Sequence, residues 1–245
     1  MTSITEQGRA FYDAVPHEVP DWEGSLFSLL EDAARFYPYR QVLEQVERGA
    51  SALVGAGVGR GDVVAVALPN CPQAFVVFYA CMRIGAVAAQ HNPLAPDPEV
   101  RGQLGRHKGR VAVVWEKCAH VYAEAGVATV FTVDISAHMP ASQRLLLRLP
   151  VRRARESRGQ LRGEAPAGSR SWDRAVAQAA PLPASYPRPG AEDVAVILHT
   201  SGTNGVPKSA PLTHRNIGVN VHQCVFWVWR LHEGAETFFS LLPYF

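Results

Sequence analysis

The sequence lacks any apolar run long enough to cross a membrane. Its longest apolar run, residues 74–82, is far shorter than the roughly 20 residues that a spanning helix needs. The first 13 residues are polar and contain no apolar segment of the kind that export signals carry. These two absences exclude a transmembrane helix and a secretory signal in this sequence, and we expect a cytoplasmic location.

Cysteine pairs and an excess of one charge are also missing. The four cysteines (Cys71, Cys81, Cys118 and Cys224) form no CxxC pair, so reduced and partly buried thiols are expected. Lys and Arg number 24 against 22 Asp and Glu, a net charge of +2, which removes the electrostatic argument for nucleic-acid binding. The apolar fraction of 47% excludes a disordered chain, and the length of 245 residues fits one large or two small domains.

Helical and strand patterns alternate along most of the sequence. Residues 62–68 (DVVAVAL) are a β-branched run bounded by glycine and proline, which is typical of a buried strand. Similar runs predict strands at 86–90, 110–115, 129–133 and 194–198, and periodic apolar positions or start signals predict helices at 25–36, 39–54, 72–84 and 96–107. This order indicates βαβ units. We therefore predict an α/β fold with mainly parallel sheets and flanking helices in layers.

A change in composition divides the chain into three parts. We predict a first α/β subdomain over 1–134, a crossover segment over 135–193 and the start of a second α/β subdomain over 194–245. The middle part contains seven prolines, and its arginines surround the apolar run at 145–149. One interpretation is a helix on a membrane surface; the other is a solvated crossover loop. We favour the loop because Pro150 would interrupt a helix.

The segment that carries chemistry follows the strand predicted at 194–198. It is rich in glycine and hydroxyl side chains and ends in a lysine, and its candidate site residues are Thr200, Ser201, Gly202, Thr203, Asn204, Gly205 and Lys208. Glycines allow backbone N–H groups to approach an anion, hydroxyls add donors, and a lysine adds a positive charge. The segment is not a Walker A loop, because Pro207 rather than glycine precedes the lysine. We predict a polyphosphate-binding loop.

Other candidate sites are weaker. Residues 55–61 (GAGVGRG) do not fit the GxGxxG spacing and follow a predicted helix, not a strand. His214 and His222 lie eight residues apart, not the four that a metal-binding pair on one helix face needs, so no metal site is predicted and His214 is expected to help start a helix. Ser201 lacks the GxSxG context of a serine hydrolase.

The segment at 200–208 (TSGTNGVPK), followed by LTHRN at 212–216, resembles the phosphate-binding signature of the adenylate-forming, or AMP-binding, ligases. GVGRGDVV at 57–64, LPNCP at 68–72, RIGAV at 83–87 and NPL at 92–94 are similar to the first subdomain of that family. The resemblance, closest to fatty-acyl-CoA synthetases, implies ATP, Mg²⁺ and coenzyme A as cofactors and a carboxylic acid, here a fatty acid, as substrate. It implies that residues 200–208 cradle the β- and γ-phosphates. An acyl-adenylate would form first, and the CoA thiol would then displace AMP.

The sequence departs from the family pattern at three places. Asn204 stands where the family usually has threonine, and the short hairpin usually found after the position of Pro38 is missing. The sequence also stops at Phe245, before the family's adenine- and ribose-binding segments and its lid with the catalytic lysine. We therefore expect the chain alone to be inactive, and we assign no catalytic residue. The alternatives are a non-catalytic remnant, a subunit completed by a C-terminal partner chain, and a module that only binds nucleotide. Peripheral membrane contact stays open.

Overall fold

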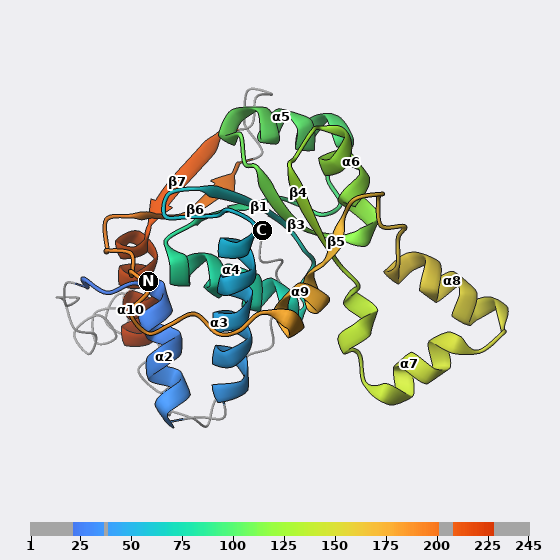
Figure 1. Ribbon diagram of the computed structural model, residues 1–245, viewed down its shortest axis with the longest axis horizontal. Helices are drawn as coiled ribbons and strands as arrows, with labels where there is room; N and C mark the ends of the chain where they lie inside the picture. The colour runs from blue at the N-terminus through green and yellow to red at the C-terminus, as the bar shows by residue number, and fades with distance from the viewer. Residues whose placement is uncertain (1–21, 37–38, 201–207, 228–245) are drawn as a thin grey trace, which may run out of the picture.

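A single seven-stranded sheet organises the chain. The computed structural model describes residues 22–36, 39–200 and 208–227, and its strands lie in the order β5-β4-β3-β1-β2-β6-β7 (Figure 1). Their bounds are β1 Val63–Ala67, β2 Val87–Gln90, β3 Val111–Trp115, β4 Thr129–Val133, β5 Arg170–Ser171, β6 Val194–His199 and β7 Ser209–Thr213. All neighbouring strands are parallel except β6 and β7. The predicted α/β fold with a mainly parallel sheet is confirmed.

The centre of the sheet is buried on both faces. β1 lies between β2 and β3, with Val64 opposite both Ala88 and Val111. Every residue of β3 is buried, as its unbroken apolar sequence predicts for a central parallel strand. Helices α3 (Arg40–Gly55), α4 (Pro72–Ile84), α5 (Asp97–His107) and α6 (Ala119–Glu124) cover the sheet (Figure 1). Because α4, α5 and α6 each connect one parallel strand to the next, the carboxyl ends of β1, β2 and β3 meet at one edge.

Local signals in the sequence explain where α4 begins and ends. Pro72 occupies the first turn, where its missing N–H leaves no hydrogen bond unmade. Gly85 ends the helix in the left-handed region, with φ of 71°, a conformation that favours glycine. Near this end Arg83 is fully buried, and its guanidinium pairs with Glu47 of α3 at 2.8 Å and contacts the carbonyl of Pro183 at 3.2 Å. The arginine thus joins α3, α4 and the proline-rich segment.

Three further helices complete the described body of the molecule. Helix α2 (Leu26–Phe36) packs beside α3 and α4, and α10 (His214–Trp227) follows β7. Helix α9 (Trp172–Gln178) begins with a buried tryptophan whose ring meets Phe131 of β4 edge-on at 5.6 Å. The remaining short elements are two 3₁₀ turns, Glu116–Cys118 and Ile135–His138. Within the described residues, no helix is long and apolar enough to span a bilayer.

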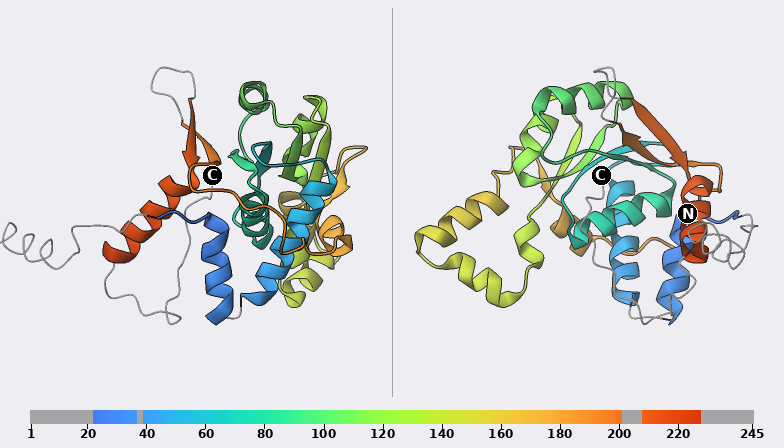
Figure 2. Two further views of the ribbon diagram at one scale, coloured as in Figure 1. Left: turned by 60° about the vertical axis from the view of Figure 1, so that its left-hand side comes forward. Right: turned by 180° about the vertical axis from the view of Figure 1, so that it is seen from behind.

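The interpretation of residues 135–193 as a solvated loop is wrong for α9 in its second half and for most of its first half. Two helices form in the first half, α7 (Ala141–Arg148) and α8 (Arg152–Leu161), and Pro150 lies between them rather than within one. We call residues 141–162 the arm. It projects from the body at the opposite end of the sheet from α10 (Figures 1 and 2). Leu145 and Leu146 are 65% and 60% exposed, so these helices form without burying their apolar face.

Several expectations lie outside the described residues or stay untested. Residues 37–38, where the family hairpin would begin, and residues 201–207 of the candidate loop belong to the parts of the chain that the structure does not describe. The division at 134 and 193 stays a prediction, and β6 joins the same sheet as β1–β4. The four cysteines are free, with Cys81 and Cys118 buried and Cys224 exposed.

Candidate functional site

The predicted phosphate-binding segment connects two antiparallel strands. β6 and β7 form a hairpin in which His199 pairs with Ser209. One step beyond, the Thr200 N–H donates to the Lys208 carbonyl at 2.9 Å, and the Lys208 N–H donates to Thr200 Oγ1 at 3.3 Å. Both residues are exposed. Thr200 and Lys208, the two ends of the candidate segment, therefore lie together at the carboxyl end of β6, which is parallel to β2.

The structure describes only the two ends of this candidate site. It brings Thr200 and Lys208 together, whereas Ser201, Gly202, Thr203, Asn204 and Gly205 lie outside the described residues. If the segment connected a strand to a helix, its lysine would stand at the start of that helix. Here Lys208 directly precedes a strand, β7. The antiparallel return strand was not predicted, and Pro211 within it explains why: proline is tolerated only at sheet edges, and β7 is an edge strand.

The LTHRN segment fixes the base of the hairpin. The Thr213 N–H donates to Asn216 Oδ1 at 2.9 Å, and the Asn216 N–H donates to Thr213 Oγ1 at 3.1 Å, a reciprocal cap at the start of α10. His214 is fully buried and accepts a hydrogen bond at Nδ1 from the Leu26 N–H at 3.1 Å. Burial lowers the pKa of His214 to about 4, so the ring is neutral at physiological pH. Helix α10 begins at His214, as expected, but the side-chain cap comes from Thr213 and Asn216, while the His214 ring binds the Leu26 N–H.

Three histidines meet beside the start of the candidate loop. His91 follows β2, His107 ends α5 and His199 ends β6. The Nε2 atoms of His91 and His107 lie 2.9 Å apart, and the ring centroids of His91 and His199 lie 5.1 Å apart. Burial, the largest cause, lowers the pKa of His91 to about 2 and that of His107 to about 4, and it lowers the pKa of His199. No local pattern in the sequence indicates this cluster, because its members are far apart along the chain.

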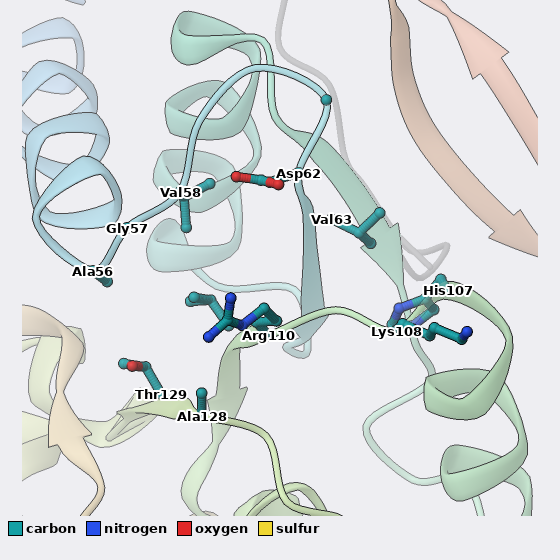
Figure 3. Close-up of a pocket in the computed structure, with 12 residues that line it drawn as sticks. Ala56, Gly57, Val58, Asp62, Val63, His107, Lys108, Arg110, Ala128 and Thr129 are labelled. Carbon is teal, nitrogen blue, oxygen red and sulfur yellow. The ribbon is translucent and has the colours of Figure 1, made fainter.

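A polar cavity of about 360 Å³ lies near the starts of β1, β3 and β4, lined in part by residues of the 55–61 segment (Figure 3). Asp62, Lys108 and Arg110 contribute charged side chains. Gly57 adopts a φ of 86° there, the left-handed conformation that glycine permits. Ligands of parallel α/β sheets bind beyond the carboxyl ends of strands, whereas this cavity lies at amino ends, so it is a weaker nucleotide site than the hairpin.

An apolar groove of about 430 Å³ lies between α4 and the β6–β7 hairpin. Phe75, Phe78 and Tyr79 line it from α4, and Leu198 and Leu212 line it from the two strands. The groove and the candidate loop thus share strands β6 and β7. A ligand with an apolar part and a phosphate-linked part could contact both regions.

Comparisons with known proteins agree on one family. Residues 20–245 match the family of AMP-binding enzymes. The chain is 27% identical to a long-chain-fatty-acid–CoA ligase of Bacillus subtilis over 94% of its own length and 44% of the relative's, and 30% identical to the 4-coumarate–CoA ligase-like protein 9 of rice over 89% and 35%. ATP-bound MatB from Rhodopseudomonas palustris superimposes with a TM-score of 0.55 at 27% identity, covering 76% of this chain and 31% of that one.

The chain thus spans less than half the length of these relatives. The family match, in contrast, covers most of the chain, including the hairpin and the groove. The sheet order, the hairpin at the carboxyl end of β6 and the LTHRN cap all lie within the matched region. We conclude that this chain belongs to the family of AMP-binding enzymes and is related to the acyl-CoA ligases.

Proposed function

We propose that residues 200–208 bind the β- and γ-phosphates of ATP, and that the chain supplies this site to an ATP-dependent acyl-CoA ligase. One observation carries the proposal. The hairpin closes on the Thr200–Lys208 backbone pair, so both ends of a glycine- and hydroxyl-rich segment are held at the carboxyl end of a parallel strand. Backbone N–H groups and a lysine in fixed positions stabilise phosphate charge without reorganisation during the reaction.

Mg²⁺ would supply further neutralisation of the phosphate charge. This ion prefers oxygen ligands and keeps several waters. Thr200 at the hairpin end offers a hydroxyl oxygen, whereas Lys208 repels a cation. We therefore propose that Mg²⁺ is held mainly by the ATP phosphates and water, with the Thr200 hydroxyl oxygen as the protein's contribution.

The proposed reaction has two steps. A carboxylate oxygen attacks the α-phosphorus of ATP and displaces pyrophosphate, which gives an acyl-adenylate. The thiol sulfur of coenzyme A then attacks the acyl carbon and releases AMP. We propose a fatty acid as the carboxylate, since the apolar groove beside the hairpin suits an acyl chain and the Bacillus subtilis relative is named a long-chain-fatty-acid–CoA ligase.

Nucleotide titration tests the loop. We expect the purified chain to bind Mg·ATP in isothermal titration calorimetry, and Lys208→Ala to weaken binding about tenfold or more, because a charge-assisted hydrogen bond contributes about 1.5–3 kcal/mol. Lys108→Ala is the matched control, since Lys108 lines the cavity at the amino ends of the strands. Equal weakening by both substitutions, or weakening by Lys108→Ala alone, would overturn the assignment.

Mixing experiments test the ligase proposal. A second chain that spans the remaining length of the Bacillus subtilis relative can be produced separately and added. If this chain acts as a subunit completed by a C-terminal partner, fatty-acid-dependent ATP–pyrophosphate exchange appears in the mixture and is absent with Lys208→Ala. Exchange by neither the chain nor the mixture, with Mg·ATP binding intact, would favour the alternative of a module that only binds nucleotide.

We also propose that the arm contacts an anionic membrane surface. Residues 141–162 contain seven arginines and one glutamate, so the arm is strongly positive. Leu145, Leu146, Leu149 and Val151 are 43–65% exposed on the same segment. Amphipathic helices of this kind insert their apolar face at the headgroup boundary while arginines pair with anionic lipids. Exposed leucines favour lipid over nucleic acid, whose phosphates need only the charge.

Vesicle sedimentation tests the arm. We expect binding to vesicles that contain phosphatidylglycerol, little binding to pure phosphatidylcholine, and loss of binding on the double substitution Leu145→Ser and Leu146→Ser. Val225→Ser, an equally exposed apolar position on α10, is the control and should bind normally. Unchanged binding of the double variant would contradict membrane insertion, and binding to DNA in place of vesicles would show that the arm recognises phosphate alone.

A further inference from the structure

We propose that His91, His107 and His199 form a binding site for a divalent transition metal, of which Zn²⁺ is the representative. One ligand nitrogen from each of the three lies within 4.8 Å of the others. No carboxylate or thiol joins this group among the described residues. Three imidazoles with a free fourth position are a known ligand set for zinc, and imidazole also suits copper and nickel. The site is independent of the proposed function.

The spacing of the nitrogens is close to what a metal requires. Two nitrogens bound to tetrahedral zinc at about 2.0–2.1 Å lie about 3.3 Å apart. The Nε2 atoms of His91 and His107 are now 2.9 Å apart and share a hydrogen bond. For a metal to replace the shared proton, the two Nε2 atoms must move apart by a few tenths of an ångström. His199 needs to approach by a rotation of its side chain, whose ring already lies against that of His91.

The hydrogen bonds around the cluster assign the protons in the metal-free protein. The Gly109 N–H donates to His107 Nδ1 at 3.1 Å, so the proton of this neutral ring is on Nε2. His107 Nε2–H therefore donates to His91 Nε2, which places the His91 proton on Nδ1, 2.9 Å from the Tyr122 hydroxyl. Both nitrogens of His91 and of His107 thus have partners. This network holds the two rings in place before any metal arrives.

His199 is the exception, and its unpaired nitrogen points to a missing ligand. Its Nδ1 lies 3.2 Å from Ser209 Oγ, whereas its Nε2 is buried and has no hydrogen-bond partner among the residues that the structure describes. A buried nitrogen without a partner carries the full desolvation penalty of a polar group. A metal at Nε2 would satisfy it, with the Nδ1–H donating to Ser209 Oγ. Such outer hydrogen bonds orient metal-binding histidines in known sites.

Metal binding through Nε2 of all three rings has one structural consequence. His91 and His199 keep their outer partners, Tyr122 and Ser209, as acceptors for Nδ1–H. His107 must move its proton from Nε2 to Nδ1, so the hydrogen bond from the Gly109 N–H is lost. The hydrogen bond from the Gly109 N–H and the one between the Nε2 atoms of His107 and His91 are exchanged for three metal–nitrogen bonds. Burial keeps the rings neutral, and neutral imidazole is the form that binds metal.

The position of the cluster predicts a structural role for a bound metal. His199 is the residue immediately before Thr200, where the candidate phosphate loop begins, and His107 comes from α5. A metal would therefore fix the end of β6 to α5 and to the end of β2. It would be chemically distinct from Mg²⁺ at the phosphates, which prefers oxygen ligands.

Metal titration without nucleotide tests the proposal. The chain is purified without a histidine tag, treated with EDTA and titrated with Zn²⁺ by calorimetry, and Co²⁺ is added separately to record its visible absorption. We expect one equivalent of Zn²⁺, tetrahedral Co²⁺ bands and a higher melting temperature with metal. His107→Gln and His199→Gln should each weaken Zn²⁺ binding at least tenfold. We leave His91 unchanged because its full burial makes a substitution there a risk to folding.

His120→Gln is the matched control, since this exposed histidine lies 3.2 Å from the carboxylate of Asp97 and resembles an adventitious surface site. It should bind Zn²⁺ as the unchanged protein does. Circular dichroism without metal verifies that each variant is folded. Absence of stoichiometric Zn²⁺ binding, or equal weakening in His120→Gln and His199→Gln, would overturn the proposal. Because no ATP is present, these outcomes do not depend on the phosphate loop.

Discussion

The central strands bury their apolar side chains, whereas the arm leaves most of its apolar side chains exposed. In β3 all five residues are buried, whereas α7 contains no buried residue and α8 contains only Ala154. The arm is instead tied at its end by polar contacts: Trp115 Nε1–H donates to the Leu161 carbonyl at 2.9 Å, and Arg162 pairs with Asp134. The comparison indicates that stability comes from the body, while the arm is a surface element that the body only holds in place.

We expect the largest loss of stability in the body from a substitution of Trp172. Its ring is 1% exposed and packs against Phe131 and Gly49. Trp172→Ala should lower the free energy of unfolding by about 3–5 kcal/mol, because the residual cavity adds to the lost burial. Urea denaturation followed by circular dichroism measures it, with Leu94→Ala, at a site 76% exposed, as a control expected to change stability by less than about 0.5 kcal/mol. Similar effects at both positions would contradict the assignment of Trp172 to the core.

Two arginine–glutamate pairs allow a matched comparison of body and arm. Arg83 is buried against Glu47 and lies over the ring of Phe27 at 5.3 Å. Arg83→Ala should destabilise the fold by about 3 kcal/mol, since it leaves a half-buried carboxylate unpaired. Arg152→Ala removes an exposed pair with Glu156 in the arm and should cost at most about 0.5 kcal/mol. The same denaturation experiment measures both, and a large effect in the arm would break the comparison.

The buried ring of His214 makes the stability of the body depend on pH. Burial lowers its pKa in the folded protein to about 4, below the 6.5 of an exposed histidine, and the nearby Asp193 carboxylate opposes this shift. The unfolded chain therefore binds the proton more readily. The stability that the neutral ring contributes is complete above pH 6.5 and is lost as the pH falls from 6.5 towards 4. Between pH 7 and 5 the loss should be about 2 kcal/mol.

Urea denaturation at pH 7 and pH 5 measures this loss. His214→Asn should reduce the difference between the two pH values by about 2 kcal/mol, although His91 and His107 contribute further pH dependence of the same sign. Leu94→Asn, at an exposed position without a titratable group, serves as the control and should leave the difference unchanged. An unaltered difference in His214→Asn would show that this ring is accessible to protons in the folded protein.

The sequence predicted the body far better than the arm. Strands β1–β4 and β6 and helices α2–α5 lie within one residue of their expected bounds, because buried apolar runs and glycine or proline stops are local signals. The arm helices were predicted as a loop, since their apolar residues face solvent and Pro150 suggested a break. Of the candidate site, the phosphate-binding role of residues 200–208 stays a prediction, and the structure describes only Thr200 and Lys208 at its two ends. The sequence could not predict β7 or the histidine cluster, because both depend on contacts between distant segments.

We expect the smallest change in stability from substitutions of the arm's leucines. Leu145→Ser with Leu146→Ser should change the free energy of unfolding by less than about 0.5 kcal/mol per position, because both side chains are already more than half exposed and lose little burial. Urea denaturation in the absence of lipid measures this. A loss above about 2 kcal/mol would mean that the leucines pack against another part of the chain, and the arm would then be a second core rather than a membrane-binding surface. If the free energy of unfolding changes little while vesicle binding is lost, the leucines act in membrane binding and not in the stability of the body.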